Sequence, residues 1–424
     1  MKKYNVFMEI AGKSINVGDI KGESSGDSCF SYSQEYLSKD SAKAISISLP
    51  LHDEYFSAER TRRFFDGLLP EGFMRKTIAT DMHFSEDDYL SILSFLGREC
   101  LGAIRICEEE DVLDSGYNEI SEKQVEELAS EGTKKSSEMI IKSHISLTGA
   151  SGKVGLYYDE KKGKWYLPYG LAPSTHIVKQ SHVRLDGIVA NEQLSMMTAG
   201  KCGIEIPDSF IINVGKGTDS EVLFATKRYD RIINETSEII NNLKRPFRLH
   251  QEDFAQALGI SSFDKYEKGD EEYASKMFRL IRDNISNPLS EQLKLYRRIV
   301  FNFVIGNTDA HIKNYSLLYN QNLNEISLAP AYDIVSTVIY ENATREMSFG
   351  IGGTRDINRI NKDNFRMMAS QINLGEKIAV KEYENILNKF ESSIRESARE
   401  LKEMGFNNAN NICERIINAR KNIL

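Results

Sequence analysis

The first hundred residues alternate apolar and polar positions before they turn helical. The runs "YNVFMEIAG" (4–12) and "ISISLPL" (45–51) have the alternation typical of half-buried strands. "SAERTRRFFDGLLPEG" (57–72) predicts a helix with Ser57 as its N-cap and a stop at Pro70 to Gly72. "SEDDYLSILSFLGREC" (85–100) predicts another helix behind Ser85, with acids in its first turn. We expect a small α/β domain over residues 1–107.

A charged segment follows this first domain. Residues 108–138 contain few apolar side chains, although "SEKQVEELA" (121–129) could form a short helix. We expect the segment to connect two structural units.

Strand-like runs return after the charged segment, and helical spacing follows them. The expected strands are "MIIKSHISL" (139–147), "KVGLYYD" (153–159), "KWYLPYG" (164–170), "THIVKQ" (175–180), "FIINVG" (210–215) and "VLFATKRYD" (222–230). The expected helices are "NEQLSMMTAGKCG" (191–203), "QEDFAQALG" (251–259), "YASKMFRLIRDN" (273–284), "SEQLKLYRRIVFNFVIGN" (290–307) and a C-terminal pair from near residue 381. The pattern predicts an α+β domain over 139–424, with a strand-rich lobe to about residue 230 and a helical lobe from about residue 231.

Composition sets few limits on function. Of 424 residues, 41% are hydrophobic, which is enough for two or three domains with cores of their own. The net charge of −8 gives no general attraction to nucleic acid. The five cysteines show no C-x-x-C pair, so we expect reduced thiols and neither zinc nor disulfides. Because no apolar run approaches roughly 18 residues and the N-terminus does not resemble a signal peptide, we expect a soluble, cytoplasmic protein without a membrane span.

Polar residues at fixed offsets interrupt the apolar run "IGNTDAHIKNYSLL" (305–318). Asp309 and Asn314 lie five positions apart, and Asp333 follows in "LAPAYDIVS" (328–336). Phosphoryl-transfer sites use this order: an Asp accepts the substrate proton, and an Asn and a later Asp hold magnesium. Mg²⁺ prefers hard oxygen ligands, and the base must be a separate carboxylate. The alternative is that Asp309 and Asn314 only cap a helix and a turn.

Three upstream features favour the first interpretation by their order. Gly149, Gly152 and Gly155 lie between strand-like runs, where glycine lets backbone N–H groups approach phosphates; the alternative is an ordinary hairpin. Lys179 lies on a following strand with Glu192 in the next helix, although a strand lysine often only faces solvent. "LFATKRYDR" (223–231) lies between the lobes, as a hinge or as an edge strand.

These residues resemble a known family, the HipA-like serine/threonine kinases, which are toxin components of bacterial toxin–antitoxin pairs. "SISLPL" and "RRFFDGLLPEG" resemble the family's N-terminal domain. Nine blocks resemble its kinase region in the family's order: "ISLTGASGK", "PSTHIVK", "NEQLSM", "GIEIPD", "KRYDR", "LHQEDFAQALG", "KYE", "GNTDAHIKN" and "LAPAYDIVS". The resemblance implies a bilobal protein-kinase-like fold behind a small α/β domain, with ATP and Mg²⁺ as cofactors.

The resemblance also implies a role for each matching residue. The catalytic group is Asp309, His311, Asn314 and Asp333, with Asn314 and Asp333 as the magnesium ligands. The nucleotide contacts are Thr148, Gly149, Ala150, Ser151, Gly152, Lys153, Lys179, Lys227, Arg228, Tyr229, Asp230 (beside the ribose), Lys313 and Tyr332. Ser146 matches a serine that such kinases autophosphorylate, which ejects the loop and stops activity. The loop departs from the common G-x-Q-x-K as "GASGK", and Lys227 replaces a frequent acid.

The implied function is a growth-inhibiting kinase toxin. Its substrate would be a translation component such as an aminoacyl-tRNA synthetase, and a DNA-binding HipB-like antitoxin would neutralise it and carry most of the operator DNA contact. Two alternatives stay open at this point: an antitoxin-bound transcriptional corepressor or scaffold with little catalysis, and a small-molecule or lipid kinase.

Overall fold

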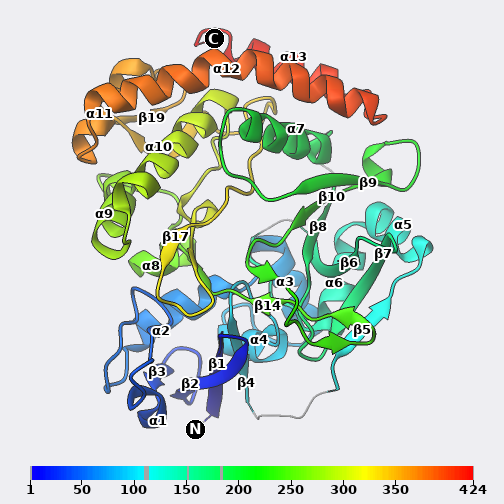
Figure 1. Cartoon of the computed structure of the whole chain (residues 1–424), viewed down its shortest axis with the longest axis vertical. Helices are drawn as coiled ribbons and strands as arrows, with labels where there is room; N and C mark the ends of the chain where they lie inside the picture. Colours follow the sequence, from blue (N-terminus) through cyan, green and yellow to red (C-terminus); the bar gives the residue numbers. More distant parts are fainter. Residues whose placement is uncertain (1, 109–113, 150–151, 182–184, 424) are drawn as a thin grey trace. The chain divides into compact units, whose positions relative to one another are not determined.

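Two compact units make up the chain. The structure, a computed structural model, describes residues 2–108, 114–149, 152–181 and 185–423 (Figure 1). Unit 1 comprises Met1–Gln180, Ala225–Ser262 and Leu317–Glu325, and unit 2 comprises Ser181–Phe224, Phe263–Ser316 and Ile326–Leu424. Each unit is therefore assembled from segments distant in sequence. The domain boundaries at residues 107 and 139 stay a prediction.

The elements follow one another along the chain with these bounds. The strands are β1 (Lys2–Ile10), β2 (Lys13–Gly22), β3 (Cys29–Tyr32), β4 (Ile104–Cys107), β5 (Gly116–Glu119), β6 (Lys153–Asp159), β7 (Lys164–Tyr169), β8 (His176–Gln180), β9 (Ser209–Asn213), β10 (Val222–Lys227), β11 (Arg231–Ile232), β12 (Ile239–Ile240), β13 (Leu243–Lys244), β14 (Phe247–Arg248), β15 (Gln251–Asp253), β16 (Ser316–Tyr319), β17 (Ile326–Leu328), β18 (Glu346–Ile351) and β19 (Thr354–Asp356). The α-helices are α1 (Gln34–Leu37), α2 (Ala58–Phe65), α3 (Gly72–Asp81), α4 (Tyr89–Leu96), α5 (Glu122–Glu131), α6 (Thr133–Ser143), α7 (Ile188–Lys201), α8 (Phe254–Leu258), α9 (Tyr273–Asn284), α10 (Pro288–Ile305), α11 (Lys362–Gln371), α12 (Glu376–Glu403) and α13 (Ala409–Arg420). The 3-10 turns are η1 (Asp66–Leu68), η2 (Asp219–Glu221), η3 (Ser262–Asp264) and η4 (Ile312–Asn314).

The N-terminal part of unit 1 is an antiparallel sheet with helices. Its strand order is β3-β2-β1-β4, as the alternation of residues 4–12 predicts for β1. Helix α2 begins where Ser57 accepts a hydrogen bond from the Arg60 amide at 3.3 Å, as expected. Its residues Thr61, Phe64 and Phe65 are buried at helical spacing, so one face of α2 packs into the core.

Two expectations for this part are wrong. "ISISLPL" forms a turn with an isolated bridge between Ser46 and Leu49, because the Ser46 hydroxyl and the Ile47 amide donate to the carboxylate of Glu252 instead of to a strand. Helix α4 is capped by Asp88, not Ser85: the Asp88 side chain accepts from the Ser91 amide at 3.3 Å. Either residue can act as an N-cap, and only the backbone geometry selects between them.

The remainder of unit 1 contains an antiparallel sheet in which β5 pairs with β7, β7 with β6, and β6 with β8. The charged segment supplies β5 and helix α5, which confirms a helix at 121–129 with a Ser121–Gln124 capping box. The expected strand at 139–147 is wrong, since Met139 and Ile140 belong to α6. A short apolar run alone does not distinguish a buried helix from a strand.

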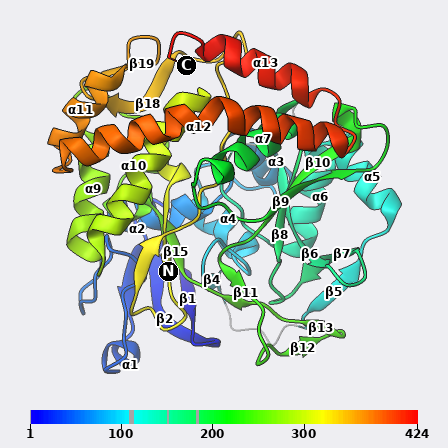
Figure 2. The same cartoon turned by 45° about the horizontal axis from the view of Figure 1, so that its top comes forward.

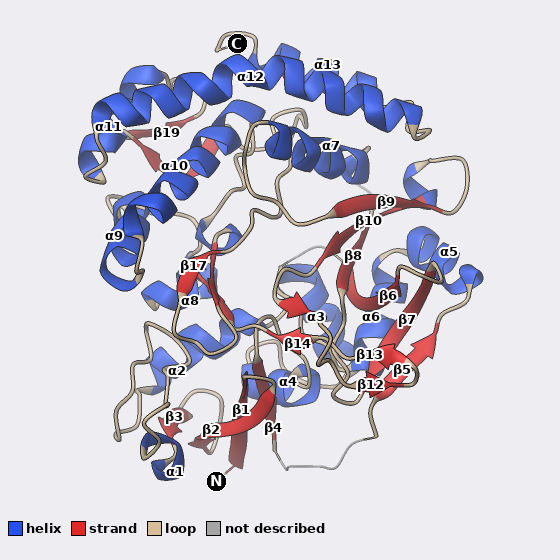
Figure 3. Ribbon diagram, in the orientation of Figure 1, coloured by secondary structure: helices blue, strands red, loops and turns tan. Residues whose placement is uncertain are grey.

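Helices dominate unit 2. Helix α12 packs against α7, α10, α11 and α13 (Figures 2 and 3). The face of α10 that ends in Ile299, Val300, Phe303 and Val304 is fully buried. Short strands β17, β18 and β19 add to a region for which the sequence predicted helices alone. No helix in the described ranges combines the length and the apolar character that a bilayer span requires.

Glu252 links three distant segments of unit 1 and gives stability a pH dependence. Its carboxylate accepts from Ser46, Ile47 and the Tyr319 hydroxyl, the last at 2.5 Å. Burial raises the pKa of Glu252 to about 7. Because the folded state then binds the proton more tightly than the unfolded chain does, the stability from this group is present at low pH and is lost as pH rises through 7.

We expect the free energy of unfolding to fall by about 3 kcal/mol from this group between roughly pH 4.5 and pH 7. Urea unfolding of the wild type and Glu252→Gln over this range measures it, because the variant lacks the titrating group. Parallel curves for the two proteins would contradict the assignment to Glu252.

Candidate functional site

The end of helix α10 in unit 2 fixes the loop that carries Asp309. Gly306 ends the helix in the left-handed region at φ +78, where its missing Cβ removes the steric cost. The Asn307 side chain then donates to Asn302 Oδ1 at 2.9 Å and accepts from the Asp309 amide at 3.2 Å. Thr308 is bonded through its amide to Thr337 Oγ1 at 2.8 Å. A buried core thus holds the backbone of this loop.

Asp309 presents an exposed carboxylate from this fixed backbone. Its Oδ1 accepts a hydrogen bond from the Tyr266 hydroxyl at 2.6 Å. Its carbonyl accepts from the His311 amide at 2.8 Å and from Asn314 Nδ2 at 3.0 Å. Because Asn314 donates through its nitrogen, its amide oxygen is directed away from the Asp309 carbonyl and is the atom suited to a cation.

The other residues expected in this loop lie around it. His311 and Lys313 are 7% and 6% exposed, and Lys313 belongs to η4 with Asn314. The Tyr332 hydroxyl donates to the Lys313 carbonyl at 2.8 Å and lies 2.6 Å from Ser316 Oγ. Tyr332 therefore ties the segment before Asp333 to the loop.

Asp333 adopts a backbone conformation that non-glycine residues rarely use. Its φ is +58, in the left-handed region, which costs about 1 kcal/mol or more for such a residue. Asn307 Nδ2 lies 3.4 Å from the Asp333 carbonyl and so connects it to the Asp309 loop. Unit 2 thus brings Asp309, Asn314 and Asp333 into one hydrogen-bonded assembly.

The donor set of this assembly fits magnesium. One carboxylate and one amide oxygen are hard ligands, and Mg²⁺ in kinases completes its shell with waters and phosphate oxygens. Within the described ranges no group of three or more His, Cys, Asp or Glu residues could hold a metal.

The glycine loop lies in unit 1, and its stem is bonded to the N-terminal domain. We expected a strand on each side of the glycine turn. In the described part of the chain the first strand is absent, because α6 and an irregular segment precede β6. The Ser146 amide donates to the Glu99 carbonyl at 2.7 Å, and its hydroxyl donates to the Leu68 carbonyl at 2.7 Å. Ser146 is fully buried, so the loop must move before a phosphate could be attached there.

Two glycines of this loop lie close to the ends of long side chains. Gly149 has a φ of +102 and accepts from the Glu71 amide at 3.1 Å, and a Cβ there would meet Lys153 Nζ at 2.6 Å. A Cβ on Gly152 would lie 1.6 Å from Gln180 Nε2. Thr148 is half-buried beside them, and Ala150 and Ser151 lie outside the described residues.

Two lysines face each other across the strands that follow the loop. Lys153 on β6 and Lys179 on β8 are register partners, and they are 8% and 9% exposed. Like charges at paired positions are unfavourable, and an anion between them offsets the repulsion. With Lys153 Nζ beside Gly149, the pair is suited to phosphate oxygens. Glu192, expected near Lys179 in sequence order, is buried in α7 of unit 2.

The expected hinge segment in unit 1 is fixed by its side chains. The Arg228 amide donates to the Thr175 carbonyl at 2.8 Å, which continues the sheet contact beyond β10. Lys227 is exposed and pairs with Glu160 at 3.4 Å, and the Tyr229 hydroxyl donates to Gln251 Oε1. The backbone of this segment remains the part suited to adenine.

Asp230 was expected beside the ribose, but the structure places it in a buried charge network. Its two carboxylate oxygens accept from the Arg228 guanidinium at 2.9 and 2.8 Å, and the Gly102 amide donates to it at 2.8 Å. It is 2% exposed. Burial alone would raise the pKa of Asp230, but Arg228 and Arg231 hold it well below its usual range.

Glu99 is a central residue that the sequence did not reveal. It is 2% exposed, and its side chain accepts from Arg228 at 3.1 Å, Arg231 at 2.9 Å and the Ser174 amide at 3.0 Å. Its carbonyl accepts from Ser146. The sequence offered one indication that Glu99 is buried: it is an acid within the run "SFLGREC" (94–100), whose other residues are largely apolar. Glu99 thus joins the loop stem to the hinge segment within unit 1.

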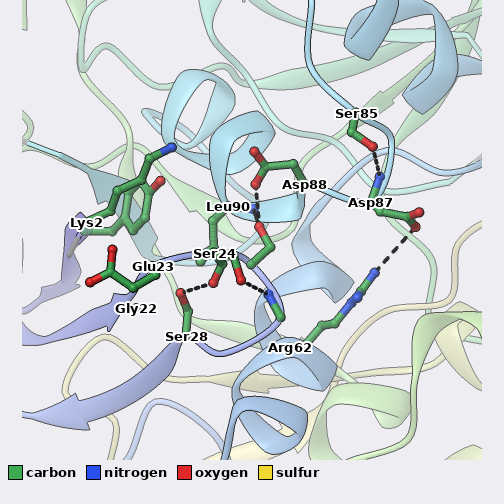
Figure 4. A pocket seen from close by; sticks show the side chains of 13 residues that line it. Lys2, Gly22, Glu23, Ser24, Ser28, Arg62, Ser85, Asp87, Asp88 and Leu90 are labelled. Carbon is green, nitrogen blue, oxygen red and sulfur yellow. Dashed lines mark hydrogen bonds and ion pairs between the residues drawn. The ribbon is translucent and has the colours of Figure 1, made fainter.

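A separate pocket lies in the N-terminal domain (Figure 4). Lys2, Arg62, Asp87, Asp88 and a serine-rich turn line it. Arg62 pairs with Asp87 at 3.8 Å, and Ser25 donates to Asp88. None of the described residues predicted for the site lines this pocket.

Comparisons with known proteins give the family. Residues 8–107 match the HipA N-terminal domain, and residues 145–397 match the HipA-like C-terminal domain. The chain is 29% identical over 369 residues to "Putative kinase Y4mE" of Sinorhizobium fredii, covering 85% of this chain and 84% of that protein. It is 26% identical over 364 residues to the serine/threonine-protein kinase toxin HipA of Shewanella oneidensis, covering 82% and 80%.

The fold matches a solved structure as well. The Shewanella oneidensis HipA in a complex with HipB and operator DNA superposes with a TM-score of 0.79 at 20% identity, over 99% of this chain and 97% of that one. This likeness confirms the expected fold class, an α+β kinase-like domain preceded by a HipA-type N-terminal domain.

Proposed function

Because the chain belongs to the HipA-like family, we propose that it is a serine/threonine protein kinase that uses ATP and Mg²⁺ and acts as a growth-inhibiting toxin. The observation that supports this most directly is the hydrogen-bonded assembly of Asp309, Asn314 and Asp333 in unit 2. A loop that only capped a helix would not need an exposed acid on a backbone fixed by buried hydrogen bonds. Nor would it need Asp333 in a left-handed backbone conformation.

In the proposed reaction, the γ-phosphoryl group moves from ATP to the oxygen of a serine or threonine hydroxyl. The bond to the ADP oxygen breaks, and Asp309 takes the hydroxyl proton. When bound, Mg²⁺ would offset the negative charge of the phosphate oxygens. Asn314 and Asp333 would hold the ion, with His311 and Lys313 completing the loop and Tyr332 supporting it.

Unit 1 would bind the nucleotide. We assign the phosphates to Thr148, Gly149, Gly152, Lys153 and Lys179, because the lysine pair and the glycine backbone suit anions. Ala150 and Ser151 belong to the same proposed loop. The adenine would meet the backbone of Lys227 to Tyr229, while Arg228 and Asp230 hold that backbone from inside.

The proposed partner is a HipB-like DNA-binding antitoxin, as in the complex of the Shewanella oneidensis protein. The antitoxin would carry most contacts with operator DNA. The proposed substrate is a translation component such as an aminoacyl-tRNA synthetase, and Ser146 is the proposed site of autophosphorylation.

Incubation of the full chain with labelled ATP, Mg²⁺ and a bacterial lysate tests this function. We expect label in a lysate protein and, in the absence of lysate, in the chain itself. Ser146→Ala should lose the label on the chain itself. Because it also loses the hydrogen bond to the Leu68 carbonyl, its free energy of unfolding should fall by about 1 kcal/mol. The removal of Mg²⁺ with a chelator should stop both.

Other outcomes would favour other functions. Label in a metabolite and in no protein would favour a small-molecule or lipid kinase. No transfer, together with retained binding of an antitoxin on operator DNA, would favour a corepressor or scaffold.

A further inference from the structure

The phenol of Tyr266 touches the proposed catalytic base. Its hydroxyl donates to Asp309 Oδ1 at 2.6 Å, across 43 positions of sequence. Its ring packs edge-on against His311, with the centroids 5.3 Å apart. At 41% exposed, Tyr266 is not part of a core that would require it for stability. The contact therefore needs an explanation other than packing.

The neighbouring residue holds Tyr266 in place. Glu267 is 6% exposed, and its carboxylate accepts from the Tyr273 amide at 2.6 Å and the Gly350 amide at 2.5 Å. Its amide donates to the Ser348 carbonyl at 2.9 Å. Backbone and side chain of Glu267 are thus fixed to helix α9 and strand β18, and the Tyr266 backbone is fixed with them.

The same strand also anchors the loop of Asp309. Ser348 Oγ donates to the Thr308 carbonyl at 2.8 Å, one residue before Asp309. Tyr266 and Asp309 are therefore both attached to Ser348 through one intervening residue each. The phenol and the carboxylate meet because a common support in unit 2 fixes the distance between their backbones.

We propose that Tyr266 is a positioning residue for the base: its hydrogen bond sets the rotation of the Asp309 carboxylate. This inference rests on the proposed kinase function. A carboxylate has about four acceptor positions, so one phenol leaves capacity for a substrate hydroxyl.

Tyr266→Phe in the full chain tests the proposal, since it removes the hydroxyl and keeps the ring against His311. We expect kcat to fall about 10-fold to 100-fold, because the carboxylate loses its orientation. KM for ATP should change less than about 2-fold, because Tyr266 makes no proposed nucleotide contact. Together with unchanged urea unfolding, this split between kcat and KM separates a positioning role from a purely structural one.

Tyr55→Phe is the matched control. Tyr55 is also exposed, at 56%, and it contacts Lys21 in the N-terminal domain instead of the catalytic loop. Its loss of a hydroxyl should leave both kcat and KM unchanged. Both variants should unfold at the wild-type urea concentration.

Three outcomes separate this inference from the function on which it rests. An unchanged kcat in Tyr266→Phe would overturn the positioning role. A faster Tyr266→Phe enzyme would overturn it too, because the phenol would then compete with the substrate hydroxyl for Asp309. If Asp309→Asn in the same assay were fully active, the proposed function would fail; if Asp309→Asn were inactive and Tyr266→Phe normal, only the role of Tyr266 would fail.

Discussion

Glu99→Gln is expected to lower the free energy of unfolding by about 3–5 kcal/mol, the usual cost of removing one partner of a buried ion pair. The Glu99 side chain is 2% exposed and balances Arg228 and Arg231, which are 0% and 1% exposed. Burial would raise the pKa of Glu99, but these arginines lower it, so the carboxylate is charged in the folded protein. Glutamine keeps the shape and removes the charge that the arginines require.

The same substitution should weaken nucleotide binding beyond its effect on stability. Glu99 holds Ser146 in the loop stem through its carbonyl and Arg228 in the hinge through its carboxylate. When the hinge loses this anchor, we expect KM for ATP to rise more than kcat falls. Urea unfolding and the ATP dependence of the rate measure the two effects.

Glu119→Gln is the matched control for Glu99. Glu119 pairs with Lys164 at 2.6 Å, but both side chains are about half exposed. Exposed pairs contribute roughly 0–1 kcal/mol, so this variant should unfold close to the wild type. If Glu99→Gln were as stable as Glu119→Gln, the buried network would not hold the hinge.

The candidate loop around Asp309 could be singled out from the sequence because it is nearly contiguous. Asp309 and Asn314 lie within six residues behind an apolar helix, and Asp333 follows shortly after, so local order reveals their chemistry. Strands with clear alternation, such as β1, and helices with an apolar stripe, such as α10, were predictable for the same reason. Each of these signals is carried by residues close together in the chain.

The rest depends on contacts between distant residues. "ISISLPL" is a turn because Glu252, some 205 positions away, bonds to it. Nothing local in the sequence shows that Arg228 turns back onto Asp230 and onto Glu99, 129 positions before Arg228. Tyr266 appeared only as a family block, and its role follows from a hydrogen bond that sequence order does not encode. A buried ionic network leaves a weak local pattern, because its partners come from separate segments.

Asp309→Asn is expected to reduce phosphoryl transfer about 100-fold or more, the contribution of a general base. Asparagine cannot take the substrate proton, but its carbonyl oxygen can still accept from Tyr266. The backbone bonds from His311 and Asn314 to residue 309 also remain. We therefore expect unfolding by urea to be unchanged. Asp333→Asn should lose activity as well, through the proposed metal.

Asp363→Asn is the matched control, since Asp363 is 77% exposed in the same unit and pairs with Arg366. It should keep the wild-type rate and arrest growth on expression, whereas Asp309→Asn should do neither. Growth arrest by a folded but inactive Asp309→Asn protein would mean that arrest comes from binding to a partner and not from phosphoryl transfer. If Asp309→Asn alone lost both phosphoryl transfer and growth arrest, toxicity would depend on the proton acceptor. The control supports this conclusion because Asp363→Asn removes the same charge from another exposed position of the same unit.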